Sequence, residues 1–180
     1  MAKDQVVTLT SENWQLYKQI RLESLLMEPH AFSSNYSDVL QRPDSHWQER
    51  LIEAQAGEKS CLLFAKENEQ IIGMIGATFA EENGVVEIIS VYVSKEKRGH
   101  GVATALMASI LEEVGQGNAF WKAVLTVSAD QTAAVAIYGI LVFKSLEIRA
   151  ESWVMEISTR AISWKRNWGN CYKESATCLT

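Results

Sequence analysis

A short glycine-containing segment holds the residue types best suited to binding phosphate. It reads Arg98, Gly99, His100, Gly101, Val102, Ala103 and Thr104. Gly99 and Gly101 carry no Cβ, so the backbone can adopt unusual dihedral angles and a ligand can approach it closely. A glycine loop at the start of a helix also presents unpaired N–H groups and the positive end of the helix dipole. The segment therefore predicts a phosphate-binding loop, with a turn that only connects two elements as the alternative.

The flanking segments place this loop between a strand and a helix. Residues 85–93 form an apolar run rich in β-branched side chains, with the length of a strand buried on both faces. From Val102 onward, apolar side chains recur with helical spacing until Gly115. A P-loop would end in Gly-Lys-Ser/Thr, and a dinucleotide fingerprint would place its glycines directly after the strand. Neither motif fits, which argues against an NAD-binding domain.

The loop resembles the pyrophosphate motif of the GNAT superfamily of acetyl-CoA-dependent N-acyltransferases. That motif reads Arg or Gln, two residues, Gly, one residue, then Gly or Ala, and Arg98, Gly101 and Ala103 match it in order. Three further segments resemble the family's central strand, its next strand and its final helix: residues 87–93, 125–130 and 134–143. The resemblance covers roughly residues 6–157 and implies acetyl-CoA as co-substrate.

The reaction implied by this resemblance needs a base for the amine and an acid for the leaving thiolate. A lysine-like amine has a pKa of about 10, and Glu87 is the best candidate to take its proton. A carboxylate inside the apolar run should be desolvated, which makes it a stronger base, and the resemblance puts a catalytic glutamate here in some members. A structural ion pair is the alternative for Glu87. Tyr138 matches the tyrosine that protonates the leaving sulfur, with a core aromatic residue as the alternative.

The resemblance also implies which residues contact CoA. The backbone of residues 91–93 is expected to hold the pantetheine arm and the thioester carbonyl, and residues 98–104 the pyrophosphate, with the His100 side chain in solvent. The complete expected set is Val91, Tyr92, Val93, Arg98, Gly99, His100, Gly101, Val102, Ala103, Thr104, Gln131, Ala134 and Tyr138.

Two residues depart from the family pattern. Gln131 stands where Asn is usual, and its longer side chain would shift the contact with pantetheine. Val142 stands where Gly usually precedes Phe143, and a β-branched residue tolerates the positive φ of a helix C′ position poorly. The end of the last helix could therefore be rebuilt, and Tyr138 could move with it.

The composition indicates one acidic globular domain. The chain has 180 residues, 47% of them hydrophobic, and a net charge of −5, which argues against nucleic acid as a partner. The three cysteines fit a reducing compartment better than a disulfide scaffold. No apolar signal region or membrane-length run occurs, so we expect a cytoplasmic protein. His30 and His46 lack a third ligand at useful spacing, so no metal site is expected.

The pattern of apolar residues predicts an α+β fold with α/β/α layers. The sheet is expected to be mixed and mostly antiparallel, with one parallel βαβ crossover that forms a splayed CoA-binding fork. Strands are expected over residues 6–9, 61–66, 71–80, 85–93, 121–127, 143–148 and 153–157, the last two as an antiparallel pair. Helices are expected over residues 12–28, 45–56 and 102–115. Residues 1–158 would form the domain, and residues 159–180 a partly ordered or disordered extension.

The sequence thus predicts a cytoplasmic N-acetyltransferase that moves an acetyl group directly from acetyl-CoA to a primary amine in a ternary complex. The acceptor would be a small molecule or a peptide amine, with no metal, nucleic acid or membrane involved and a homodimer possible. The alternative is a catalytically weak acyl-CoA-binding or regulatory module. An acidic chain favours a cationic acceptor. We expect an acidic acceptor end (Glu23, Glu28, Asp38, Glu81 and Glu82) and a basic CoA end (Lys95, Lys97 and Arg98).

Overall fold

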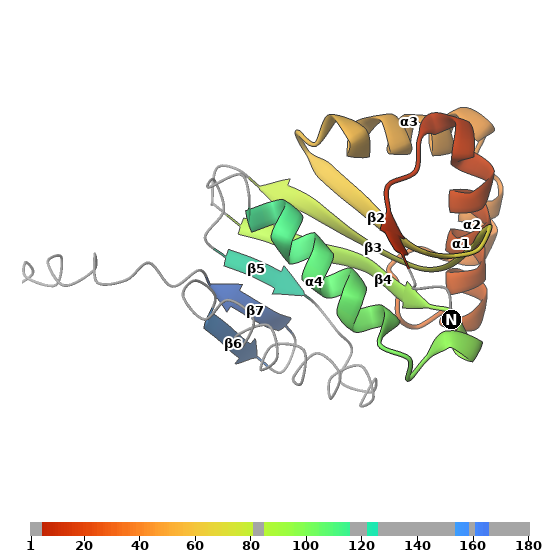
Figure 1. Cartoon of the computed structure of the whole chain (residues 1–180). Coiled ribbons are helices and arrows are strands. Elements are labelled where there is room, and N and C mark those ends of the chain that lie inside the picture. Colours follow the sequence, from red (N-terminus) through yellow and green to blue (C-terminus); the bar gives the residue numbers. More distant parts are fainter. Residues whose placement is uncertain (1–4, 81–84, 116–121, 126–153, 159–160, 166–180) are drawn as a thin grey trace, which may run out of the picture.

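The computed structural model describes residues 5–80, 85–115, 122–125, 154–158 and 161–165. Its strands are β1 (Gln5–Val7), β2 (Ser60–Glu67), β3 (Gln70–Ala80), β4 (Val85–Val93), β5 (Lys122–Leu125), β6 (Val154–Ser158) and β7 (Ala161–Lys165). Its helices are α1 (Trp14–Met27), α2 (Tyr36–Leu40), α3 (Asp44–Ala56) and α4 (Val102–Gly115), with 3-10 turns at Ser11–Asn13 and Lys95–Lys97. The described strands form one sheet in the order β1-β2-β3-β4-β5-β7-β6 (Figure 1).

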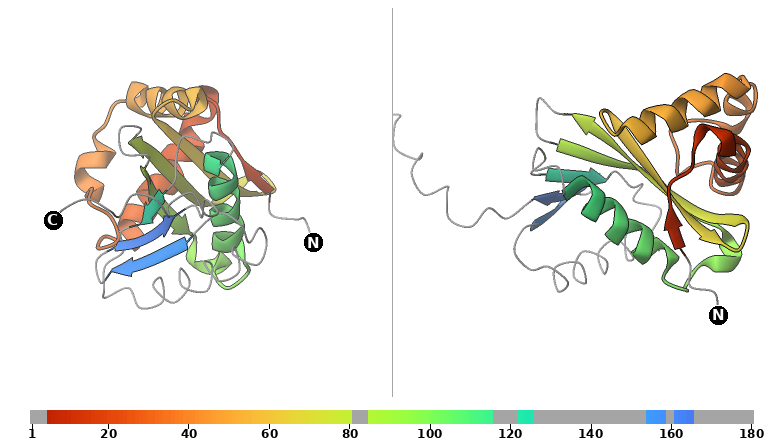
Figure 2. Two further views of the ribbon diagram at one scale, coloured as in Figure 1. Left: turned by 90° about the vertical axis from the view of Figure 1, so that its left-hand side faces the viewer. Right: turned by 45° about the horizontal axis from the view of Figure 1, so that its top comes forward.

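Helices cover both faces of this sheet. Helix α4 lies on one face, whereas α1, α2 and α3 lie on the other (Figures 1 and 2). Successive residues of β2 alternate between the two sides, since Leu63 packs in the cluster that includes α4, and Leu62 and Phe64 pack with α1 and α3. This two-sided packing explains why β2 reads as a continuous apolar run. The expected α+β fold with α/β/α layers is confirmed.

The mixed sheet follows the predicted topology. Strands β2, β3 and β4 are consecutive antiparallel neighbours, and β5 runs parallel to β4 after the α4 crossover. The β2–β3 turn contains Asn68 at φ 55°, a left-handed conformation that asparagine tolerates. Helix α4 packs close to β3 because Gly73 lies beneath it, and a Cβ added there would come 3.1 Å from Leu106 Cδ1. This close packing holds the start of α4 beside the end of β4.

The helices before β2 form as expected, with one addition. Helix α1 buries Tyr17, Ile20 and Leu25 at helical spacing and ends before Pro29, as predicted. Helix α3 ends at Gly57 in the left-handed conformation. The short helix α2 was not predicted, although Asn35 caps it by accepting a hydrogen bond from the backbone N–H of Asp38 at 2.9 Å. Five residues are too few to show helical periodicity.

One sequence prediction about the strands is wrong, since β4 is not buried on both faces: Glu87 is exposed. Strand β6 pairs with β7, a pairing that was not predicted. Residues 143–148, the predicted partner of β6, lie outside the described residues. Strand β7 also pairs with β5, so residues 161–165 of the expected C-terminal extension belong to the sheet. The signal was present, since Ile162 and Trp164 alternate with Ser163 and Lys165.

Candidate active site

A bulge interrupts β4 just beyond its last described pair with β5. On β3, Met74 pairs with Tyr92 and Gly76 pairs with Ile89, so β4 has one more residue between these pairs than β3 has. Ser90 in this bulge has φ 56°. The parallel β4–β5 register among the described residues ends at Ile88, opposite Leu125. The bulge therefore directs backbone groups away from regular pairing, as bulges beside active sites often do.

The glycine loop after β4 has the geometry of a phosphate cradle. Gly99 and Gly101 have φ of 78° and 86°, which only glycine adopts at low cost. Apart from the adjacent residues, no heavy atom in the described part of the chain lies within 4 Å of a Cβ built at either position, so the described residues leave open space beside the loop. Helix α4 begins at Val102, and the N–H groups of its first turn have no partner within the helix. This backbone geometry suits a pyrophosphate such as that of CoA, and the role of the loop stays a prediction.

The cations beside this loop are engaged within the chain. Arg98 donates from Nη2 to Glu28 Oε1 at 2.9 Å and from Nε to the Val93 carbonyl at 3.1 Å. Lys97 forms an ion pair with Glu67. His100 is exposed, as expected, and its Nδ1 lies 3.0 Å from the Arg98 carbonyl oxygen. The basic CoA end that we expected is thus partly neutralised before any phosphate binds.

Glu23 of α1 is hydrogen-bonded to residues at and just after the end of β4. Glu23 Oε1 accepts hydrogen bonds from the Tyr92 hydroxyl at 2.9 Å and from Ser94 Oγ at 2.7 Å. Burial raises the pKa of Tyr92 well above its ordinary value, and the hydrogen bond to Glu23 adds to this effect. Tyr92 therefore stays protonated and donates to Glu23. Together with the Glu28–Arg98 pair, these bonds join α1 to the end of β4.

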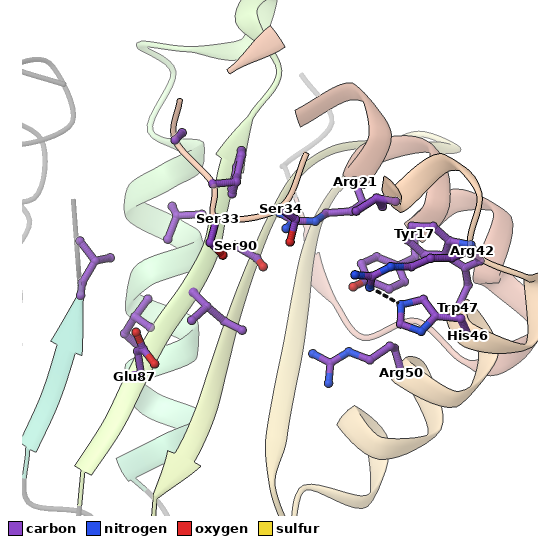
Figure 3. Close-up of a pocket in the computed structure, with 17 residues that line it drawn as sticks. Tyr17, Arg21, Ser33, Ser34, Arg42, His46, Trp47, Arg50, Glu87 and Ser90 are labelled. Atoms are coloured by element: carbon purple, nitrogen blue, oxygen red, sulfur yellow. Dashed lines mark hydrogen bonds between the residues drawn. The ribbon is translucent and has the colours of Figure 1, made fainter. Parts of the chain in front are cut away.

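A pocket of about 680 Å³ opens between this bulge and the helical layer. The β4 side is formed by residues 87–91, and Leu125 of β5 also lines the pocket. Across from them lie residues of α1 and α3 (Figure 3), and the loop before α2 also lines the pocket. The volume falls in the range of small-molecule sites. The bulge, and with it Val91 of the expected CoA-binding set, therefore lines a cavity large enough for an acceptor.

Glu87 lines the pocket, but its environment differs from the one expected. It lies opposite Thr78 on β3 and Val124 on β5, and its side chain is exposed. The expectation of a desolvated carboxylate is therefore wrong, because the apolar neighbours in sequence alternate to the other side of the strand. The residue is nevertheless on the pocket wall, so its role as a base stays a prediction.

The helical wall of the pocket is basic. Arg21, Arg42 and Arg50 line it together with His46, whereas Glu87 is the one carboxylate among the described lining residues. Arg42 Nη1 lies 2.8 Å from His46 Nε2, a bond marked in Figure 3. Burial, together with the charges of Arg42 and Arg50, lowers the pKa of His46. The imidazole is therefore neutral near pH 7 and accepts a hydrogen bond from the guanidinium.

The acidic acceptor end that we expected is therefore wrong for the described residues. Glu23 and Glu28 are bound at the end of β4, and Asp38 accepts from Asn35 in the α2 cap. Glu81 and Glu82 lie outside the described residues. The basic wall was missed although His46 and Arg50 lie one turn apart on α3 and Arg42 lies just before the start of that helix. Arg21 joins them only through the packing of α1 against α3.

Several predicted site residues cannot be placed. Tyr138, Gln131, Ala134 and Val142 lie outside the described residues. Within the described part of the chain, no group of three or more His, Cys, Asp or Glu side chains could hold a metal ion. In the same ranges, no helix combines the length and apolar character needed to cross a membrane.

Comparisons with known proteins agree on one family. The family model described as the acetyltransferase (GNAT) family matches residues 20–140. Among curated proteins, human N-acetyltransferase 8 is 26% identical over 89 residues, which are 47% of this chain and 39% of that protein. The match thus spans about two fifths of the length of that relative.

Solved structures show the same fold at low sequence identity. A GNAT-family acetyltransferase from Streptococcus pneumoniae has a TM-score of 0.71 at 14% identity, covering 92% of this chain and 99% of its own. PaiA N-acetyltransferase from Thermoplasma acidophilum, in complex with coenzyme A, has a TM-score of 0.67 at 15% identity, and the match covers 91% of this chain and 99% of that one. Spermidine N-acetyltransferase from Vibrio cholerae, in complex with CoA and spermine, has a TM-score of 0.62 at 14% identity, and the match covers 92% of this chain and 94% of that one.

Proposed function

Because this chain belongs to the GNAT family of acetyltransferases, we propose that it transfers the acetyl group of acetyl-CoA to a primary amine in a ternary complex. One observation carries the proposal. Strand β4 joins the two halves of the site, since its bulge lines the pocket and its end leads into the glycine loop at the start of α4. A single strand thus connects a place for phosphate with a place for an acceptor.

The residues that would hold CoA follow from this arrangement. The N–H groups of residues 99–104 are suited to the pyrophosphate, and the backbone at Val91 to the thioester carbonyl oxygen. Acetyl-CoA supplies the acetyl group as an activated thioester. Structural neighbours solved with CoA or acetyl-CoA support this choice of donor.

The chain's own side chains provide the proton transfers in this proposal. Glu87, on the pocket wall, takes a proton from the acceptor ammonium directly or through a water, so that the neutral nitrogen attacks the thioester carbonyl. The new C–N bond forms as the C–S bond breaks, and Tyr138 gives its proton to the leaving sulfur. The acylated nitrogen then releases its second proton to water, and the Tyr138 phenol is restored by a proton from water. The role of Tyr138 rests on the family resemblance alone.

A transfer assay tests this proposal. The purified chain is incubated with acetyl-CoA and single amines, and both free thiol and acetylated amine are quantified. We expect at least one class of amine to yield one acetylated product per thiol released, at a rate that Glu87→Gln lowers. Tight binding of acetyl-CoA without amine-dependent thiol release would instead indicate an acyl-CoA-binding module.

A further inference from the structure

We propose that the acceptor is an amine that also carries an anionic group, a carboxylate or a phosphate, and that Arg21, Arg42 and Arg50 bind that group. This inference rests on the proposed function, because it specifies the substrate of the same site. It also reverses the expectation from composition, since a net negative chain presents a locally positive pocket.

The first argument for an anionic acceptor is the net charge of the pocket walls. With His46 neutral, the described lining residues comprise three guanidinium groups and the Glu87 carboxylate, an excess of two positive charges. Only Arg50 of the three has an ion pair in the described part of the chain, with Glu53 at 3.0 Å. Like charges that face one cavity repel each other, so an anionic ligand would relieve their repulsion. A polycationic acceptor would add to it.

Arg21 provides the second step because part of its guanidinium is buried without a partner. Its Nη1 is inaccessible to solvent and forms no hydrogen bond with the described residues, while the guanidinium carbon lies 4.6 Å from the Phe32 ring centroid. An unpaired buried donor costs about 1–3 kcal/mol, more for a charged group. An acceptor supplied by a ligand or by an ordered water would remove this cost.

Arg42 is also suited to bind the anionic group of the acceptor. Its Nη1 donates to the neutral His46 ring, which fixes one edge of the guanidinium. The planar fork retains further N–H groups that match the two oxygens of a carboxylate or phosphate. His46 therefore acts as a positioning residue, because it holds Arg42 without cancelling its charge.

The opposite wall fixes the orientation of the acceptor. In Figure 3, Glu87 and Ser90 lie on β4 on the other side of the pocket from Arg42, His46 and Arg50. The ammonium group is thus attracted to the β4 wall, where the acetyl group would arrive, and the anionic group to the helical wall. The pocket accordingly suits a zwitterionic amine such as an amino acid or an aminoalkyl phosphate.

Product binding tests this inference without requiring catalysis. Calorimetry compares matched pairs that differ in the anionic group: N-acetylglycine and its amide, N-acetylphenylalanine and its amide, and N-acetylated phosphoethanolamine and N-acetylethanolamine. We expect at least one anionic member to bind roughly tenfold or more tightly than its neutral partner, the range expected for a charged hydrogen bond. The carboxylate and phosphate arms separate the two anion types.

Arginine variants show where that preference originates. Arg21→Gln should abolish most of it, Arg42→Gln should weaken it, and Arg21→Lys should restore part of it. Lys18→Gln is the matched control, because Lys18 lies on the same helix, pairs with Asp44 at 3.0 Å and does not line the pocket. Circular dichroism of each variant establishes that it folds.

The possible results are distinct. The inference is overturned if no anionic member binds better than its neutral partner, or if the preference survives in both folded glutamine variants, Arg21→Gln and Arg42→Gln. If the preference is found but no amine is acetylated, the proposed function fails and the anion site stands. If amines without an anionic group are acetylated as well as amines that carry one, and the members of each product pair bind equally, only the anion site fails.

Discussion

The Tyr92 hydroxyl donates to Glu23 Oε1 at 2.9 Å, and this bond joins β4 to α1 two residues beyond the Ser90 bulge. Ser94 donates to the same oxygen at 2.7 Å. Helix α1 also carries Arg21, so one helix holds both the end of β4 and part of the basic pocket wall. The two halves of the site are thereby mechanically joined.

Removing the Tyr92 hydroxyl should therefore weaken the fold by a definable amount. Tyr92→Phe keeps the buried ring and loses one hydrogen bond to a carboxylate, so we expect a loss of about 1.5–3 kcal/mol in the free energy of unfolding. Urea denaturation measures it. Tyr36→Phe is the control, because its hydroxyl has no hydrogen bond among the described residues. Equal changes in the two variants would show that the Tyr92–Glu23 bond contributes nothing.

The phosphate cradle should depend on the positive φ of Gly101. Gly101→Val forces a β-branched residue into a left-handed conformation that costs about 1–2 kcal/mol even for ordinary residues, so CoA should bind roughly ten times more weakly. Gly57→Val is the matched control, since Gly57 has φ 68°, equally open surroundings and a position at the end of α3. Calorimetric titration with CoA compares them. Equal affinities of the two folded variants would remove the cradle from the account.

Cys61 should make the protein less stable in alkaline solution. Burial, with a smaller contribution from the charge of Glu113, raises the pKa of the Cys61 thiol to about 11. A thiol whose folded pKa exceeds its unfolded value of 9.0 contributes stability below pH 9. That contribution, about 2 kcal/mol, is lost as the pH rises through 11.

Urea denaturation between pH 8 and pH 11 measures this loss. Cys61→Ala should be less stable than the natural chain near neutral pH, because it leaves a cavity, but its stability should fall less steeply above pH 9. Cys171 and Cys178 are present in both chains, so their titration contributes equally. Parallel stability curves for the two chains would contradict the prediction.

The predicted base should reveal itself through pH. With Glu87→Gln, acetyl transfer should be slow near neutral pH and should climb as the pH approaches the pKa of the amine, about 10, because the amine then loses its proton without help. The control is Glu69→Gln, which removes one negative charge at an exposed position in the β2–β3 turn. It should leave the pH profile of acetyl transfer unaltered. A Glu87→Gln profile that matches the natural one would assign Glu87 a structural role.

The sequence could predict the elements whose signals are local. The glycine loop, the apolar periodicity of α4 and the β2–β3–β4 succession depend on residues that are close in the chain, and all were found. The bulge at Ser90 was not predictable, because it arises from the register of β4 against β3 and no glycine marks it. The exposure of Glu87 likewise depends on which side of the strand its neighbours occupy.

The basic pocket wall lies beyond sequence reasoning for the same physical reason. Arg21 of α1 and Arg42, which lies between α2 and α3, line one pocket because α1 packs against both of those helices. The net charge of the chain led to the wrong prediction of an acidic acceptor end. Most carboxylates of this acidic chain lie outside the pocket wall or outside the described residues. Local charge at a site is set by tertiary packing, which an average over the chain cannot report.

The most direct test of the central claim is a crystal structure of the chain with acetyl-CoA. The account predicts pyrophosphate oxygens bound by the N–H groups of residues 99–104, and a thioester carbonyl beside Val91 with its carbon open to the pocket that Glu87 and Arg21 line. A thioester that lies away from the β4 bulge, or a pyrophosphate bound anywhere else, would contradict it.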